Sequence, residues 1–129
     1  MKKTFSKEER LCSKREIDSL FRKGSSFLVY PFRVVYFLGC EEKALPKVLV
    51  SVSKKRMKKA VDRNKIKRKT REAYRLSKHL LRDDKQERIN IYLALQFIAS
   101  EDFPFSVFEK SVQKALTKIK DEGDKQSME

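Results

Sequence analysis

The stretch that determines the fold covers residues 60–82, AVDRNKIKRKTREAYRLSKHLLR, because its apolar residues recur at the spacing of an α-helix. Ile66, Thr70 and Ala73 fall on one face of that helix and are small enough to pack on a sheet. Polar and cationic side chains fall within an arc of roughly 100° on the opposite face: Asn64, Lys67, Arg68, Arg71, Arg75, Lys78 and Arg82. We therefore expect a helix that packs one side and presents cations on the other.

The residues before this helix predict a shorter helix. Ser13 followed by Glu16 has the spacing of a capping box, and apolar residues then repeat at helical intervals. Gly24 is a suitable stop for this helix.

Between the two predicted helices the sequence favours strands. Residues 27–38 and 48–52 are rich in Val, Phe and Tyr, which is typical of antiparallel strands, and residues 39–46 then form a polar turn. Pro31 interrupts the first stretch, so residues 25–31 either belong to it or form a separate short strand.

The residues after the basic helix predict one more strand and one more helix. Residues 88–97 have the composition of a largely buried strand, and Ser106 with Glu109 repeats the capping-box spacing. The last helix is expected to end near Gly123, with residues 121–129 as a frayed tail. No linker divides the chain, so we expect a single domain over residues 1–129.

The positive charge of the chain is concentrated. Its 129 residues carry a formal net charge of +14, and residues 54–75 hold 12 basic and two acidic side chains, a net +10. With 40% hydrophobic residues the chain can form a real core, so this charge lies on a folded surface and predicts a polyanionic partner.

Solvation is the ordinary explanation for a charged helix face, but it fits this face poorly. Solvated faces usually alternate Glu with Lys at i and i+4, whereas Lys67–Arg71, Arg71–Arg75 and Lys78–Arg82 are like-charged pairs. Each such pair costs an isolated helix about 0.2–0.5 kcal/mol. Such a face is better explained if an anion normally neutralises it.

Several classes of protein are excluded or disfavoured by composition. One histidine, His79, and two cysteines, Cys12 and Cys40, cannot form a zinc or iron–sulfur cluster, and their spacing predicts free thiols in a reducing compartment. Charged residues at 7–10 interrupt the apolar run that a signal peptide needs, and no stretch approaches the roughly 20 apolar residues of a membrane span. We expect a cytoplasmic protein with no metal site of its own.

Nucleic acid fits the basic helix better than a membrane does. A helix on a membrane surface presents large apolar residues opposite its cations, whereas here the opposite face carries Ile66, Thr70 and Ala73. The helix alone does not distinguish RNA from DNA.

Aromatic residues in the strand region are compatible with stacking of unpaired RNA bases, although an aromatic strand residue is more often part of a core. Because side chains alternate along a strand, Tyr36 lies on the opposite side of its strand from Phe37. At most one of the two sets of aromatic residues, those on the side of Tyr36 or those on the side of Phe37, therefore belongs to the core.

The basic stretch resembles the signature region of the bacterial ribonuclease P protein component. The resemblance is carried by VSKK at residues 52–55, KAV at 59–61 and RNKIKRKTRE at 63–72, and it extends over roughly residues 7–120. It implies an α+β fold: a compact two-layer sandwich with a four-stranded sheet, the element order αβββαβα, and a left-handed β-α-β crossover around the basic helix.

The resemblance also implies a function. Members are subunits of an endoribonuclease whose catalyst is an RNA, so no protein side chain is expected to be catalytic. The protein helps ribonuclease P RNA to bind precursor tRNA, holds the 5′ leader between the first helix and the sheet, and stabilises Mg²⁺ held mainly by the RNA. Neither a membrane nor a small-molecule substrate is expected.

Site residues follow from the same resemblance. Those expected to face RNA are Lys54, Lys55, Lys59, Arg63, Asn64, Lys67, Arg68 and Arg71, and those expected to receive the leader are Ile17, Phe21 and Tyr36. The chain departs from the family pattern in four places: Ile17 replaces an aromatic residue, Leu49 replaces Gly, and Leu95 with Gln96 replaces an Ala-Arg pair.

Two other functions are compatible with the same charge. A structural nucleic-acid-binding protein, associated with ribosomes or compacting DNA, would use the same basic surface but bind any duplex about equally at equal salt. A membrane-active cationic protein would bind vesicles even at moderate salt.

Overall fold

The protein is described by a computed structural model over residues 14–38, 47–81 and 91–127. Predicted features that fall elsewhere, such as the cap at Ser13, the turn at 39–46 and Arg82, lie outside the described residues. The elements in chain order are α1 (Lys14–Lys23), β1 (Ser25–Val29), β2 (Phe32–Leu38), β3 (Lys47–Val52), α2 (Ala60–Ser77), the 3₁₀ turn η2 (Lys78–Leu80), β4 (Ile91–Phe97) and α3 (Phe105–Ser127).

The four strands form one sheet in the order β1-β2-β4-β3. β1 and β4 both pair antiparallel with β2, while β3 pairs parallel with β4. The parallel pair is joined through α2, so the chain makes a β-α-β crossover around the basic helix. The α+β class and the order αβββαβα are confirmed.

Residues 27–38 and 48–52 contain strands as predicted, but β2 and β3 do not pair with each other, because β4 lies between them. β4 is buried along almost its whole length, whereas the residues of β3 alternate between buried and half-buried. A strand that is apolar on both faces is stabilised most in the middle of a sheet, where both faces are covered. The alternative of a separate short strand before Pro31 is confirmed by β1.

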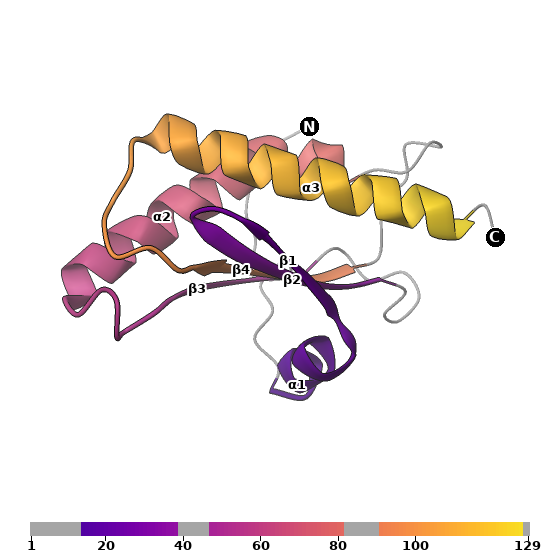
Figure 1. Ribbon diagram of the computed structural model, residues 1–129, viewed down its shortest axis with the longest axis horizontal. Helices are drawn as coiled ribbons and strands as arrows, with labels where there is room; N and C mark the ends of the chain where they lie inside the picture. Colours follow the sequence, from indigo (N-terminus) through magenta and orange to yellow (C-terminus); the bar gives the residue numbers. More distant parts are fainter. Residues whose placement is uncertain (1–13, 39–46, 82–90, 128–129) are drawn as a thin grey trace.

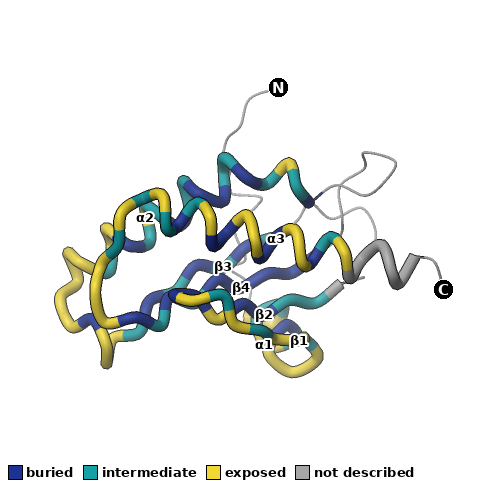
Figure 2. The backbone as a smooth tube through the Cα atoms, turned by 45° about the horizontal axis from the view of Figure 1, so that its top comes forward, coloured by how far each residue is buried: buried dark blue, intermediate teal, exposed yellow. Residues whose placement is uncertain are grey.

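Helices cover both faces of the sheet unequally. α2 and α3 lie over one face and α1 lies on the other (Figure 1). The large core cluster joins β2, β3 and β4 to α2 and α3, with Phe32, Leu95 and Phe108 among its members. The small cluster beneath α1 contains Leu20 and Val35. Buried residues are accordingly concentrated in the central strands, while many residues on the outer sides of the helices are exposed (Figure 2).

The predicted packing face of α2 is confirmed. In α2 the buried residues include Ile66, Thr70 and Ala73, and Thr70 donates its hydroxyl hydrogen to the Ile66 carbonyl at 2.9 Å. α3 continues to Ser127, past its predicted end near Gly123, so residues 121–127 are helical where a frayed tail was expected. Extending an existing packed helix adds a hydrogen bond for each residue fixed, and this offsets the roughly 1 kcal/mol that a glycine such as Gly123 costs.

α1 ends at Gly24, as the sequence predicted. The Gly24 N–H donates to the Leu20 carbonyl at 2.8 Å. A Cβ atom at this position would lie 2.3 Å from the Leu20 carbonyl oxygen and 2.7 Å from that of Tyr36, which is too close for any side chain. Glycine is therefore required where α1 turns into β1 and approaches β2.

Candidate RNA interface

The loop between β3 and α2 is held in place by a buried side chain and by hydrogen bonds. Met57 is buried in the large core cluster, and its N–H donates to the Ser53 carbonyl at 3.0 Å. Arg56 donates from Nη1 to the carbonyl of Ile98 at 2.7 Å. These contacts fix the loop backbone, so the exposed lysines at 54, 55, 58 and 59 project from a rigid support.

Arg63 reinforces the same loop from within α2. Its Nη1 donates to the carbonyl oxygens of Met57 at 3.1 Å and Lys58 at 2.7 Å. The residue is half-buried. Arg63 thus joins the first turn of α2 to the loop before it, a role that its place in the signature does not reveal.

The cations of α2 fall into two sets according to their partners. Lys69 donates to both carboxylate oxygens of Asp102, at 3.0 and 2.9 Å, and Lys65 lies 3.6 Å from the same carboxylate. Arg75 donates from Nε to Glu72 at 2.9 Å. Acids within the protein therefore already neutralise Lys65, Lys69 and Arg75, and the argument from like-charged pairs does not hold for Arg71–Arg75.

The second set forms no ion pair with the described residues. It lies on the rigid loop and along the side of α2 that faces away from the sheet, and it contains most of the predicted RNA-binding residues: Lys54, Lys55, Lys59, Lys67, Arg68 and Arg71. Exposed Asn64 lies on the same side of the helix. We call this set, with Asn64, the basic surface.

Lys58 is an exposed cation of this surface that the sequence prediction left out. The signal was its position inside the run from Lys54 to Lys59. Because seven cations with no acidic partner among the described residues gather on the rigid loop and the adjoining side of α2, the surface suits a polyanion such as a phosphate backbone.

Asp102 fixes the position of α2 relative to the start of α3. Partial burial disfavours its charged form, but hydrogen bonds from Lys69 and from the Phe103 N–H, together with the charges of Lys69 and Lys65, outweigh that effect and hold the pKa of its carboxyl below the ordinary value. Asp102 therefore remains ionised at neutral pH and keeps the two lysines turned toward α3.

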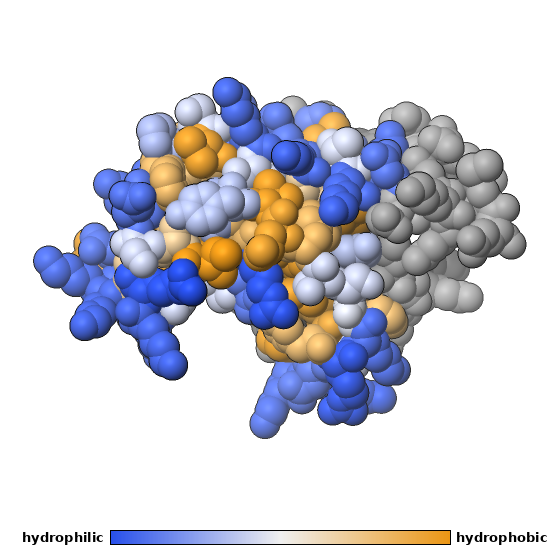
Figure 3. Space-filling view, viewed as in Figure 1, coloured by the Kyte–Doolittle hydropathy of each residue, from blue (hydrophilic) through white to orange (hydrophobic). Residues whose placement is uncertain are grey.

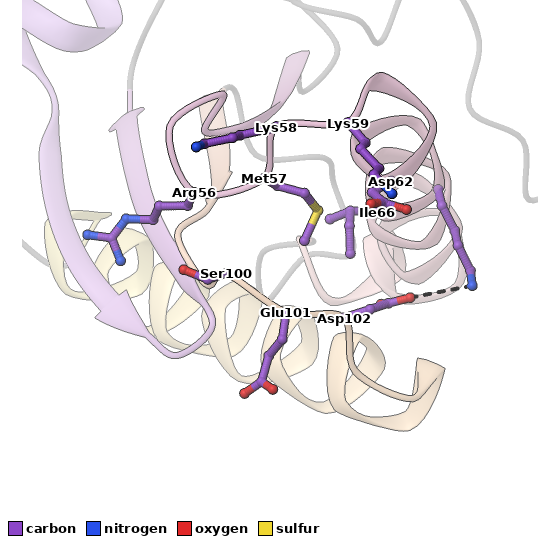
Figure 4. A pocket seen from close by; sticks show the side chains of 10 residues that line it. Arg56, Met57, Lys58, Lys59, Asp62, Ile66, Ser100, Glu101 and Asp102 are labelled. Atoms are coloured by element: carbon purple, nitrogen blue, oxygen red, sulfur yellow. Dashed lines mark ion pairs between the residues drawn. The ribbon is translucent and has the colours of Figure 1, made fainter.

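A recess of 520 Å³ lies between the start of α2 and the segment before α3 (Figure 4). Met57 and Ile66 form its apolar part, and Arg56 and Glu101 point away from it. Its remaining lining mixes lysines with Asp62 and Asp102. This balance of charge gives the recess no preference for an anion, in contrast to the basic surface.

α1 is fixed across the other face of the sheet at both of its ends. Near its start, Lys47 on β3 donates to both carboxylate oxygens of Glu16, at 3.2 and 3.0 Å. Partial burial opposes ionisation of Glu16, yet hydrogen bonds from Tyr92 and Lys47 hold the pKa of this carboxyl below its ordinary value. Near its end, Gly24 meets the backbone of β2. α1 thus crosses the sheet from β3 toward β1.

Two of the three predicted leader-binding residues lie on α1. Ile17 is half-buried against the small cluster, and the Phe21 side chain is 43% exposed. Hydrophobic side chains gather at the centre of one side of the molecule, between charged groups around α1 and the start of α2 (Figure 3).

Tyr36 does not lie with Ile17 and Phe21. Its ring packs against the large core cluster on the opposite face of the sheet, where it meets Phe27 edge-on with the ring centres 5.7 Å apart. Phe37, the next residue, joins the small cluster beneath α1. The alternation of Tyr36 and Phe37 was predicted, but which of them faces α1 depends on where the helices pack.

The positions that depart from the family pattern lie in different environments. Leu49 packs against the small cluster beneath α1, and Leu95 is fully buried on the face covered by α2 and α3. Gln96 is half-buried on the α1 side of the sheet. Only Gln96 therefore leaves a polar group where a ligand beside α1 could reach it.

Neither a metal-binding group nor a membrane-spanning helix is found among the described residues. Among them no group of three or more His, Cys, Asp or Glu side chains could hold a metal ion. Within the same ranges, no helix has the length and apolar character needed to cross a membrane.

Comparison with known proteins identifies relatives over most of the chain. Residues 5–120 match the family described as Ribonuclease P. The ribonuclease P protein component of Porphyromonas gingivalis is 50% identical over 117 residues, covering 88% of this chain and 85% of that protein. The corresponding protein of Shouchella clausii is 33% identical over 114 residues, covering 88% of each chain.

Solved structures show the same fold. The ribonuclease P protein of Staphylococcus aureus superimposes with a TM-score of 0.62 at 26% identity, covering 88% of this chain and 95% of that one. The ribonuclease P protein of Thermotoga maritima gives a TM-score of 0.65 at 24% identity, covering 85% and 96%.

Proposed function

The chain belongs to the ribonuclease P protein family, and from this membership we propose how its surfaces divide the work of the enzyme. The protein is a subunit of an endoribonuclease that acts with an RNA subunit to mature the 5′ ends of tRNAs. In our proposal the basic surface binds ribonuclease P RNA near the cleavage site, and the α1 side of the sheet binds the 5′ leader of precursor tRNA.

The observation that carries this proposal is the division of the cations of α2 by partner. Asp102 neutralises Lys65 and Lys69 beside α3, and Glu72 neutralises Arg75. The remaining cations of the helix, such as Lys67 and Arg68, have no acidic partner among the described residues. Bare cations on a rigid support lower the electrostatic cost of bringing two polyanions together.

The leader is proposed to lie beside α1, in contact with Ile17 and Phe21. An exposed aromatic ring such as that of Phe21 can stack on an unpaired base. Phe37 replaces Tyr36 in this proposal, because only Phe37 faces α1.

Mg²⁺ is proposed to be held mainly by phosphates of the RNA. Metal-assisted phosphodiester hydrolysis needs ions at the scissile phosphate, and no metal-binding cluster was found among the described protein residues. The protein's share is to reduce repulsion between the RNA strands that hold the ions. We also propose a cytoplasmic location.

Reconstitution tests the proposal directly. The full chain is added to a bacterial ribonuclease P RNA at moderate Mg²⁺, and the rate of leader removal from precursor tRNA is measured with and without protein. We expect a clear increase in rate. No increase with any bacterial ribonuclease P RNA would refute the proposal.

Selectivity separates this function from general nucleic-acid binding. At equal salt we expect tighter binding to folded ribonuclease P RNA than to a duplex of similar length. Pull-down from a bacterial lysate followed by sequencing should enrich one structured RNA, whereas an even spread of ribosomal RNA would favour a structural binding protein.

A further inference from the structure

The recess between the start of α2 and the segment before α3 has the size of a small-ligand site. Its volume of 520 Å³ lies within the range of about 300–1,000 Å³ that such sites occupy. Met57 and Ile66 point into it and form an apolar floor (Figure 4). Both residues are buried in the large core cluster, so core packing holds this floor in place. The floor offers contact to the flat face of a ring.

The charged groups of the recess differ in whether they already have partners. Lys65 lies 3.6 Å from the Asp102 carboxylate, which is also paired with Lys69. Arg56 and Glu101 point away from the recess (Figure 4). The charged side chains that remain have no ion pair with any described residue, and they are Lys58, Lys59 and Asp62.

Asp62 is the unusual member of this group. It is one of two acids among residues 54–75, and the other, Glu72, is bound to Arg75. Asp62 forms no hydrogen bond with any residue that the structure describes. Its negative charge stabilises the first turn of α2, but it would repel a phosphate placed in the recess. A ligand that fits must therefore present hydrogen-bond donors to Asp62 and anionic groups to the lysines beside it.

One nucleotide within an RNA chain combines these properties. Its base is flat and uncharged with donors on its edge, while the phosphates on either side of it are anionic. Of the four RNA bases, guanine alone presents two adjacent N–H donors, at N1 and N2, on its Watson–Crick edge. These two donors match the two acceptor oxygens of a carboxylate.

We propose that the recess takes up one unpaired guanine of the RNA that the basic surface binds, with the Asp62 carboxylate accepting hydrogen bonds from N1 and N2. This inference rests on the proposed function. Met57 and Ile66 contact the ring, while Lys58 and Lys59 bind the phosphates on either side of it. The guanine comes from a loop, bulge or joint, because a base inside a duplex has its Watson–Crick edge already paired.

The recess thereby adds to the basic surface a property that phosphate contacts lack. Contacts to phosphates position a protein on a nucleic acid, whereas contacts to a base edge depend on sequence. A guanine held by Asp62 favours a folded RNA that exposes this base over a duplex of equal charge.

The first experiment measures base preference with the free full-length protein. Pentaribonucleotides of uridine that carry guanine, hypoxanthine, adenine or cytosine at the centre have equal numbers of phosphates, so differences in affinity report the central base. At equal salt we expect guanine to bind about tenfold more tightly than adenine or cytosine. Hypoxanthine keeps the N1–H but lacks the N2 amino group, so its affinity should be intermediate. Equal affinity for all four would overturn the proposal.

Asp62→Asn tests whether this residue reads the base. An amide presents one acceptor and one donor, a pattern that matches adenine better than guanine. The preference for guanine should therefore disappear, and adenine should bind at least as tightly. Glu101→Gln is the matched control, because it removes an exposed acid that points away from the recess, and it should keep the preference. An equal change for all four oligonucleotides in Asp62→Asn would reflect the lost charge alone and would overturn the proposal.

The second experiment examines the reconstituted holoenzyme. Kethoxal reacts with N1 and N2 of unpaired guanines, the atoms that Asp62 holds in our proposal. With the RNA saturated by protein, we expect a guanine of ribonuclease P RNA to be protected by the wild type and by Glu101→Gln, and to react with kethoxal in the presence of Asp62→Asn. Failure of the wild type to support leader removal would overturn the proposed function. A functional wild type with the same kethoxal pattern as Asp62→Asn would overturn only the guanine site.

Discussion

At the scale of single residues, Arg63 stabilises the fold in addition to contributing a positive charge. Arg63→Gln removes the hydrogen bonds to the Met57 and Lys58 carbonyls, so we expect the free energy of unfolding to fall by about 1–3 kcal/mol. Urea denaturation measures this change. Arg68→Gln is the matched control at an exposed position, where the change should stay within about 0.5 kcal/mol. Equal stability of the two variants would contradict the role of Arg63.

Arg68 tests the basic surface itself. Arg68→Ala should weaken binding to ribonuclease P RNA and lower the salt slope by about one unit, because one phosphate contact is lost. Titrations of the RNA at several salt concentrations give this slope. Lys114→Ala on α3 also removes one positive charge and should leave the salt slope unchanged. An unchanged slope for Arg68→Ala would show that Arg68 lies outside the interface.

Residue roles were predictable from the sequence only where spacing alone defines them. The spacing in residues 60–82 placed Ile66 in the core and Arg68 on the surface, and the structure agrees. It could not show that Tyr36 rather than Phe37 faces the large core, since that depends on which face the long helices cover. The carbonyl partners of Arg63 were equally hidden, because they depend on the path of the loop before α2.

At the scale of elements, Asp102 couples the docking of α2 to pH. Its pKa is lower in the folded protein than in the unfolded chain, so the folded state binds fewer protons. The stabilisation is fully present above the unfolded pKa of about 4 and is lost as the pH falls through the lower folded value. Asp102→Asn should therefore cost up to about 1 kcal/mol at pH 7 and progressively less in acid.

Unfolding free energies measured in urea from pH 7 to pH 3 check this expectation. Glu101→Gln is the control, because Glu101 is exposed beside Asp102 and points away from the recess. If the difference in unfolding free energy between wild type and Asp102→Asn stays constant with pH, the ion pairs of Asp102 with Lys65 and Lys69 do not cause the loss of stability.

The elements were largely predictable from local patterns, but their pairing was not. Glycine at 24 and proline at 31 mark real boundaries, and hydrophobic periodicity located α2. Strands that follow one another along the chain usually pair, yet β2 and β3 do not. The uniform burial of β4 overrides that preference, since a strand apolar on both faces takes the centre of the sheet.

At the scale of the whole molecule, the two proposed RNA-binding surfaces lie on opposite sides of the sheet. The basic surface belongs to the α2 side, while Ile17, Phe21 and Phe37 belong to the α1 side. The rigid loop that carries Lys54 and Lys55 connects the two, because it leaves β3 at one edge of the sheet and enters α2. Of the net charge of +14, +10 belongs to residues 54–75, which run from that loop along α2.

This arrangement predicts that the two surfaces act independently. Arg68→Ala should weaken binding of substrates with and without a leader, whereas Phe21→Ala should affect only those with one. In the double variant the two losses for a long-leader substrate should add to within about 0.5 kcal/mol, because a layer of the fold separates the two residues. Binding of both substrates is measured for holoenzymes with the wild type, each single variant and the double variant. A coupling energy above about 1 kcal/mol would contradict independent action, because it would mean that Arg68 and Phe21 contact the same short segment of RNA.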